Sequence, residues 1–141
     1  MPSEVIVGNA GVDGSSRWGW FIGHFIEPSD SPRCTPDVEV KWATHKAGEG
    51  RSQWAVNAEA TTLSILISGC FRLQFSDREV ILSQPGDYAL WLPGVRHWWL
   101  AESDCTVLTV RWPSKQGDSV EVAGEKSRGG FHQSPLTEAD N

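Results

Sequence analysis

Apolar and less apolar residues alternate along most of the chain. Phe71, Leu73 and Phe75, for example, occupy every second position of one stretch. Side chains of a strand point alternately to two faces, so a period of two predicts half-buried β-strands. Helical periodicity is nearly absent. The pattern predicts strands at Arg17–Glu27, Asp37–Lys46, Leu63–Ile67, Cys70–Ser76, Glu79–Ser83, Tyr88–Leu92, His97–Ala101 and Thr106–Trp112.

Turn-forming sequences, rich in Gly, Pro, Asp and Ser, separate these strands. Two examples are Pro85-Gly86-Asp87 and Pro93-Gly94. Many short strands at regular spacing are typical of a sandwich or a barrel. A closed barrel or jelly roll also leaves no exposed strand edge. We therefore expect an all-β jelly-roll barrel.

The length of 141 residues fits a single domain. Within it we expect N-terminal strands and a loop at 1–36, a barrel core at 37–112 and a polar tail at 113–141. Residues 8–16 are expected to form a loop. The Gly-rich composition of the tail predicts a mobile segment or an arm packed on the surface.

One motif joins two of the predicted strands. A Gly-Asp turn opens the first strand, a Pro-Gly turn ends it, and His97 opens the next. Gly86, Gly94 and His97 match the spacing of the second cupin motif, G-x5-P-x-G-x2-H-x3-N. The proline is displaced by one place, to Pro93, and Ala101 replaces the final Asn. The sequence thus resembles the cupin superfamily, which implies a cupin-type jelly-roll barrel.

A second, more degenerate stretch extends this resemblance to about residues 48–112. Gly69 sets the register of the first cupin motif, G-x5-H-x-H-x3-4-E-x6-G. In that register the family's Glu falls on Thr62. Its two His fall on Ala55 and Asn57, or one residue further along with the shorter spacing.

The usual metal site of cupins is therefore expected to be absent, and we predict no cofactor. In metal-bearing cupins, three His and one Glu or Gln converge on one ion, but here only His97 is retained. A divalent transition metal needs three or more N, O or S ligands, and Thr62 and Asn57 are poor substitutes. The alternative is a single divalent metal in an unorthodox site, in which His97 is joined by His45, Glu49, Glu59 or His24.

Two interpretations of His97 stay open. It is either a hydrogen-bonded structural residue at the barrel mouth or a lumen-facing acid, base or ligand-binding group, and thus our candidate catalytic residue. In a strand, Trp99 shares the face of His97. His45 is either a solvated strand end or a group at the barrel rim. The candidate ligand-binding residues are His97, Trp99, Asn57, Thr62, Ser64 and His45.

Two arginines and the eight tryptophans also have two possible roles each. Arg72 and Arg111 can pair with a ligand carboxylate or form cross-strand ion pairs. For most of the tryptophans we favour a role in packing over a place in a pocket wall. Because cupins commonly pair through sheet faces and exchange N-terminal strands, the resemblance implies a homodimer, with the segment from Trp18 to Phe21 as a contact.

Charge and composition exclude some partners. Twelve basic and eighteen acidic residues give a net charge of −6, which argues against nucleic acid. No apolar run reaches the roughly 20 residues that span a bilayer, so we expect no membrane partner. The first residues lack the pattern of a secretory signal, and the three cysteines show neither disulfide nor zinc spacing. We expect a cytoplasmic protein.

Three hypotheses of function remain. The first is a metal-independent cupin that binds a small polar or aromatic metabolite inside the barrel. The second is an enzyme, an isomerase, cyclase, lyase or oxygenase, that uses His97 as acid and base or in an unorthodox metal site. The third is a Trp-rich structural or interaction module. The fold alone does not choose among them.

Overall fold

The computed structural model describes residues 4–122 and 135–136. Helical structure in this part is limited to α1 (Ala10–Asp13) and a 3₁₀ turn at Ser15–Arg17. The strands are β1 (Trp20–Ile22), β2 (Glu39–His45), β3 (Gly50–Arg51), β4 (Trp54–Asn57), β5 (Thr61–Ser68), β6 (Phe71–Phe75), β7 (Glu79–Leu82), β8 (Tyr88–Trp91), β9 (His97–Ala101), β10 (Cys105–Trp112), β11 (Ser119–Val122) and β12 (Pro135–Leu136).

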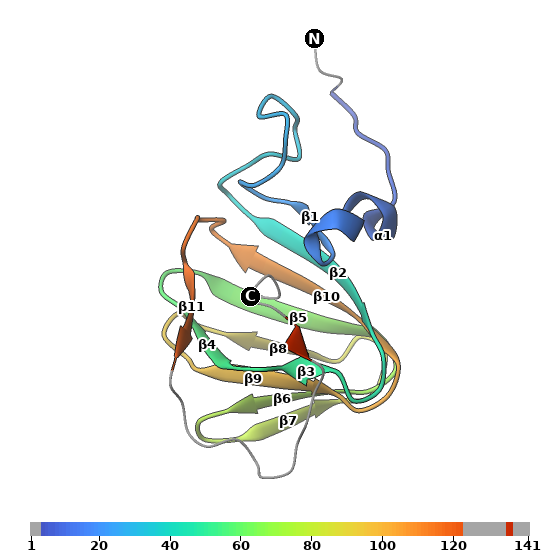
Figure 1. Cartoon of the computed structure of the whole chain (residues 1–141), viewed down its shortest axis with the longest axis vertical. Coiled ribbons are helices and arrows are strands. Elements are labelled where there is room, and N and C mark those ends of the chain that lie inside the picture. Colours follow the sequence, from blue (N-terminus) through green and yellow to red (C-terminus); the bar gives the residue numbers. More distant parts are fainter. Residues whose placement is uncertain (1–3, 123–134, 137–141) are drawn as a thin grey trace.

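These strands form two sheets that enclose a barrel (Figure 1). One sheet has the order β1-β2-β10-β5-β8, and its neighbouring strands are antiparallel. The other has the order β11-β4-β9-β3-β12, with β6 paired to β9 and β7 paired to β6. The all-β jelly-roll barrel predicted from the alternation is confirmed.

The register of the first sheet sorts its inward-facing side chains into rows, because residues directly opposite each other share a face. The row nearest β1 is Glu39, Arg111, Thr62 and Trp91. The next is Lys41, Thr109, Ser64 and Ala89, and the third is Ala43, Val107 and Leu66. The lining therefore changes from charged at one end to apolar towards the other.

The apolar end of the barrel is the main core. Leu66, Leu73 and Val107 are at most 2% exposed and pack with aromatic side chains of both sheets. Burying each such side chain contributes roughly 1.5–3 kcal/mol. A smaller cluster lies on the other face of β9, where Trp98 and Leu100 pack against Trp54. Residues of β9 are consequently buried on both faces.

Several predicted elements differ from the observed ones. The strand expected at Arg17–Glu27 is reduced to β1. Gly19 and Gly23 interrupt it, since both have φ in the positive range that favours glycine, at 104° and 154°. The expected loop at 8–16 contains α1.

The expected polar tail contributes two strands to the second sheet, β11 and β12, of which β12 pairs with β3 in parallel. Within 113–141, β11 pairs with β4 in an antiparallel ladder. Ser114 and Asp118, just before β11, are 2% and 6% exposed. The chain is thus built into the barrel as far as 122, and the part of the expected tail at 123–134 and 137–141 lies outside the described residues.

No helix within the described part of the chain is long and apolar enough to cross a membrane. Cys34, Cys70 and Cys105 are free thiols. The cytoplasmic location stays a prediction.

Candidate functional site

The barrel lumen is closely packed. Its cavity measures only about 30 Å³, which is room for about two water molecules. His97, Trp99, Ser64 and His45, four of the expected ligand-binding residues, line it. The lumen itself is therefore too small, in this conformation, for a metabolite.

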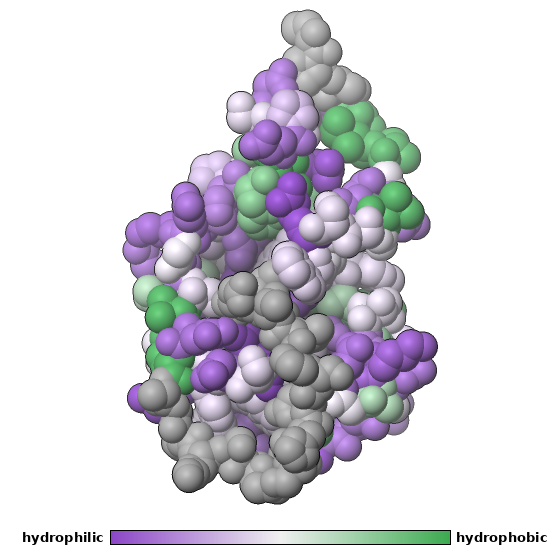
Figure 2. All heavy atoms as spheres, in the orientation of Figure 1, coloured by the Kyte–Doolittle hydropathy of each residue, from purple (hydrophilic) through white to green (hydrophobic). Residues whose placement is uncertain are grey.

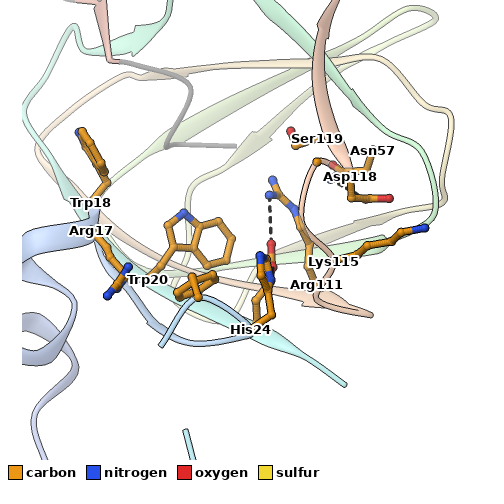
Figure 3. A pocket seen from close by; sticks show the side chains of 12 residues that line it. Arg17, Trp18, Trp20, His24, Asn57, Arg111, Lys115, Asp118 and Ser119 are labelled. Atoms are coloured by element: carbon orange, nitrogen blue, oxygen red, sulfur yellow. Dashed lines mark hydrogen bonds and ion pairs between the residues drawn. The ribbon is translucent and has the colours of Figure 1, made fainter. Parts of the chain in front are cut away.

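A larger cavity of about 270 Å³ lies at the end of the barrel next to β1, and we call it the mouth pocket (Figure 3). Asn57, from the expected set, lies on its wall. Its lining consists of Arg17, Trp18, Trp20, His24, Phe25, Glu39, Asn57, Arg111, Lys115, Gly117, Asp118 and Ser119. Side chains of β1, β2, β4 and β10 thus meet those of the segment that leads into β11.

Arg111 lines both the mouth pocket and the lumen. Its side chain is 4% exposed, and its guanidinium lies over the Trp20 ring, 5.1 Å from the centroid. The Nε–H donates to Thr62 Oγ1 at 3.3 Å, and Nη1 lies 3.5 Å from Glu39 Oε2. Burial lowers the pKa of Arg111 to about 10, partly offset by Glu39, so the guanidinium stays charged at neutral pH.

Nη1 of Arg111 is buried without a hydrogen-bond partner among the described residues. The Glu39 carboxylate is close, but a separation of 3.5 Å exceeds the 2.7–2.9 Å typical of a charge-assisted hydrogen bond. Arg111 thus brings a charged donor group to the wall of the pocket.

Glu39 is held by Ser114 and His24. Ser114 Oγ donates to Glu39 Oε1 at 2.7 Å and lies 2.7 Å from His24 Nδ1. Since the only hydroxyl proton of Ser114 goes to Glu39, His24 must donate through Nδ1–H. The three side chains form one hydrogen-bonded chain at the pocket wall.

Asn57 and Asp118 form a clamp on the opposite wall. Asn57 Nδ2 donates to Asp118 Oδ2 at 3.1 Å. The same carboxylate accepts the backbone N–H of Glu59 at 2.7 Å and of Ala60 at 3.2 Å. Asn57, expected to contact a ligand, therefore also fixes the turn between β4 and β5 to the segment before β11.

His97 lies inside the barrel and is 2% exposed. Its Nδ1 is 3.3 Å from the carbonyl oxygen of Val95, which can only accept, so Nδ1 carries the proton. The lone pair of Nε2 has no hydrogen-bond partner among the described residues. Burial, followed by the charges of Arg111 and Arg51, lowers the pKa of His97 to about 3, so the ring is neutral at pH 7.

His45 lies at the far end of the lumen, where its ring stands 4.3 Å from that of Trp99. Burial, followed by the charge of Lys41, lowers its pKa to about 3, although Nδ1 lies 3.3 Å from Glu49 Oε1. A neutral imidazole still donates to that carboxylate. Of the remaining expected residues, Ser64 Oγ lies 2.9 Å from Thr109 Oγ1, and Arg72 forms ion pairs with Glu79 and Glu102.

The residues around His97 do not fit a divalent metal. Ala55 lies directly opposite His97, Thr62 Oγ1 accepts from Arg111, and Asn57 donates to Asp118. Within the described ranges, no group of three or more His, Cys, Asp or Glu side chains is placed to hold an ion. A guanidinium in the same lumen further disfavours a cation by electrostatic repulsion.

Comparisons with known proteins show the fold. No protein-family model and no curated protein matches the sequence. Among solved structures, a double-stranded β-helix protein from Klebsiella pneumoniae aligns with a TM-score of 0.56 and 19% identity, over 64% of this chain and 78% of that one. KdgF from Halomonas sp. aligns with a TM-score of 0.51 and 21% identity, over 58% and 74%. The fold is that of the cupins.

A third cupin-fold neighbour is an enzyme. The Streptomyces protein Pac13, a nucleoside dehydratase, aligns with a TM-score of 0.54 and 16% identity, over 62% of this chain and 69% of its own. At such identities the likeness is one of fold. The cupin resemblance read from the two motifs is confirmed at that level.

Most of the mouth pocket was not foreseen from the sequence. Trp18 and Trp20 were interpreted as a dimer contact, and Lys115 and Asp118 as part of a polar tail. Glu39 belongs to a strand that we predicted, but nothing local marks it as a pocket residue. The one usable signal was Arg111, a charged residue on the strand face that also carries Cys105, Val107 and Thr109.

Proposed function

We propose that the protein binds a small organic molecule in the mouth pocket, without a metal. The observation that carries this proposal is Arg111 in the wall of a cavity of about 270 Å³, where its buried Nη1 has an ion pair with Glu39 at 3.5 Å but no hydrogen bond among the described residues. A buried charged donor without a hydrogen bond is costly, and a ligand acceptor would remove that cost.

The walls of the pocket suit an organic ligand. Trp18 is 51% exposed and takes a left-handed conformation, with φ of 54°, that sets its indole at the pocket edge. Trp20 and Phe25 line the interior, with ring centroids 6.2 Å apart. Apolar walls with a few directed polar groups are the common composition of small-molecule sites.

An acid–base enzyme is the second candidate, and the hydrogen-bonded chain of Glu39, Ser114 and His24 favours it. Such a chain can move a proton to or from a molecule in the pocket. Its residues differ from those of the His97 hypothesis, because a buried imidazole with a pKa of about 3 is a weak base at pH 7. Loss of turnover in a His24→Gln variant that still binds its substrate would distinguish the enzyme from the binding protein.

Tryptophan fluorescence tests the binding function. A panel of small metabolites, neutral and charged, is titrated into wild-type protein, and hits are measured by calorimetry. Trp18→Ala should weaken binding of a hit at least tenfold, because it removes the stacking surface. Trp112→Ala, which alters a tryptophan outside the mouth pocket, is the matched control. Absence of any hit, or equal binding by Trp18→Ala and wild type, would refute the proposal.

We also propose that the N-terminal arm, residues 4–9, packs on a second copy of the chain. The arm projects from the barrel in Figure 1, and Figure 2 shows hydrophobic residues gathered beside α1. Val5, Ile6 and Val7 are 70%, 46% and 89% exposed. Sedimentation should give a dimer for wild type and a monomer for Val7→Asp; a wild-type monomer would contradict the proposal.

A further inference from the structure

The geometry points to a flat carboxylate as the ligand, bound by the guanidinium of Arg111 in the electropositive role that an ion has in metal-bearing cupins. This inference rests on the proposed binding function of the mouth pocket. It adds the chemical class of the ligand and the residue that selects it.

Arg111 stands beside the position of a lost metal ligand. Its Nε–H donates at 3.3 Å to Thr62 Oγ1, and Thr62 occupies the place that the cupin motif assigns to a ligating Glu. A carboxylate there would bind a cation, whereas the hydroxyl of Thr62 accepts one N–H and adds no negative charge beside the guanidinium. The protein thus has the guanidinium of a side chain where metal-bearing cupins bind a metal ion.

The donors on this row of the sheet exceed its acceptors. Besides Arg111 Nη1, the Nε1–H of Trp91 is buried without a hydrogen-bond partner among the described residues. The register places Arg111 and Trp91 on either side of Thr62 and on the same inward face. Both groups only donate, so the ligand atom that satisfies them is an acceptor.

Glu39 does not use up the donor capacity of Arg111. Its Oε1 accepts from Ser114 at 2.7 Å, and its Oε2 remains 3.5 Å from Arg111 Nη1. A guanidinium has five N–H groups in a planar fork that matches the two oxygens of a carboxylate. The guanidinium therefore has N–H groups for a ligand oxygen while the ion pair with Glu39 persists.

The surrounding charge favours an anion. Lys41 and Arg51 line the lumen together with Arg111, and no Asp or Glu in the described part of the chain joins them there. The lysine Nζ also lies 5.5 Å from the centroid of the Trp20 ring that Arg111 covers. An anion at Arg111 would be attracted by these three cations and repelled by Glu39, whose Oε2 lies 3.5 Å from Nη1.

The shape of the cavity selects a flat ligand body. Because the lumen holds only about 30 Å³, the body must remain in the mouth pocket and only its acidic group can reach the guanidinium. Trp18, half-exposed at the edge, offers a face for stacking. Aryl and arylalkyl carboxylates combine both features.

Matched probe pairs test this assignment. Benzoate is compared with benzamide, and indole-3-acetate with indole-3-acetamide, by calorimetry at pH 7.5. Each pair shares its ring and differs in charge. We expect the carboxylates to bind at least tenfold more tightly than the amides, because a hydrogen bond to a charged partner is about twice as strong as a neutral one.

Two variants identify Arg111 as the selecting group. Arg111→Lys, which keeps the charge but loses the planar fork, should weaken carboxylate binding at least tenfold and leave amide binding within twofold. Glu39→Gln, which removes the competing anion, should strengthen carboxylate binding. This variant keeps the test decisive if Arg111→Lys fails to fold. Arg72→Lys, at an ion pair outside the pocket, is the matched control.

The outcomes separate this inference from the proposed function. Equal affinity for acids and amides in wild type would overturn the carboxylate assignment and leave the binding function standing. Acid binding that neither variant alters would overturn the role of Arg111. Failure of both probe classes would also overturn the assignment, and the wider metabolite panel would then decide the binding function independently.

Discussion

His97 and Ala55 lie directly opposite each other across β9 and β4, so their side chains share one face of the sheet. In one of the two registers that the first cupin motif allows, a metal-ligating His falls on position 55. A methyl group stands there instead, completely buried. The ring of His97 is neutral, and the lone pair of its Nε2 has no hydrogen-bond partner among the described residues. The charges in the lumen are those of protein side chains.

The first prediction concerns metals. Because His97 has no second ligating side chain opposite it, protein incubated with Zn²⁺, Ni²⁺ or Fe²⁺ and then desalted should retain far less than one ion per chain. Elemental analysis measures the ratio. One ion per chain in wild type, lost in His97→Ala, would contradict the prediction.

The second prediction is a loss of stability in mild acid. His97 and His45 have pKa values of about 3 when folded, against an ordinary value of 6.5. Between these values the unfolded chain binds protons that the folded chain does not, so the free energy of unfolding falls as pH drops from 6.5 towards 3. At pH 5 each histidine should cost about 2 kcal/mol.

Urea unfolding at pH 7.5 and pH 5.0 measures this loss. His97→Gln and His45→Gln should each reduce the difference between the two pH values, because glutamine does not titrate. An unchanged pH dependence in both variants would show that other groups are responsible.

The third prediction concerns the clamp at Asp118. Its carboxylate accepts three N–H donors, from Asn57, Glu59 and Ala60. Asp118→Ala should lower the free energy of unfolding by about 3 kcal/mol, since a buried turn loses its acceptors. Asp77→Ala, in an exposed turn, should change it by less than about 0.5 kcal/mol. Equal effects in denaturant titrations would argue against the clamp.

The fourth prediction concerns thiol reactivity. Cys105 is 4% exposed, and burial, followed by the neighbouring Cys70, raises its pKa to about 11. Since the thiolate is the nucleophile, native protein at pH 8 should leave Cys105 unmodified by iodoacetamide while half-buried Cys34 and Cys70 react. Mass spectrometry of tryptic peptides locates the adducts. Rapid alkylation of Cys105 in the native state would be inconsistent with its burial.

The sequence predicted strands best where one face is buried and the other is not. The alternation around Phe71–Phe75 gave β6 to within a residue at each end. β4 was missed because Trp54, Ala55 and Asn57 are all buried, which removes the alternation. β11 was missed for the opposite reason, since its residues are exposed or half-buried. β9 is buried on both faces as well, and it was predicted because the Pro-Gly turn and His97 of the second motif mark where it begins.

The mouth pocket was hidden because its contacts are long-range. Arg111 meets Thr62 from 49 positions away, and Ser114 meets Glu39 from 75 positions away. No local spacing encodes such pairs. The family motifs fixed the register of Thr62 and His97, but they describe a metal site and so directed attention to the lumen instead of the wall beside it.

The change from charged to apolar inward-facing rows along the barrel has a consequence for evolution. Under the proposed binding function, the residues that contact a ligand and the residues that hold the sheets together occupy different rows of the same strands. Under that proposal, exchanges in the charged row at Glu39 or Arg111 would alter what the protein recognises while Leu66 and Val107 in the apolar row keep it folded. New specificities can therefore arise in this chain without a stabilising substitution having to precede them.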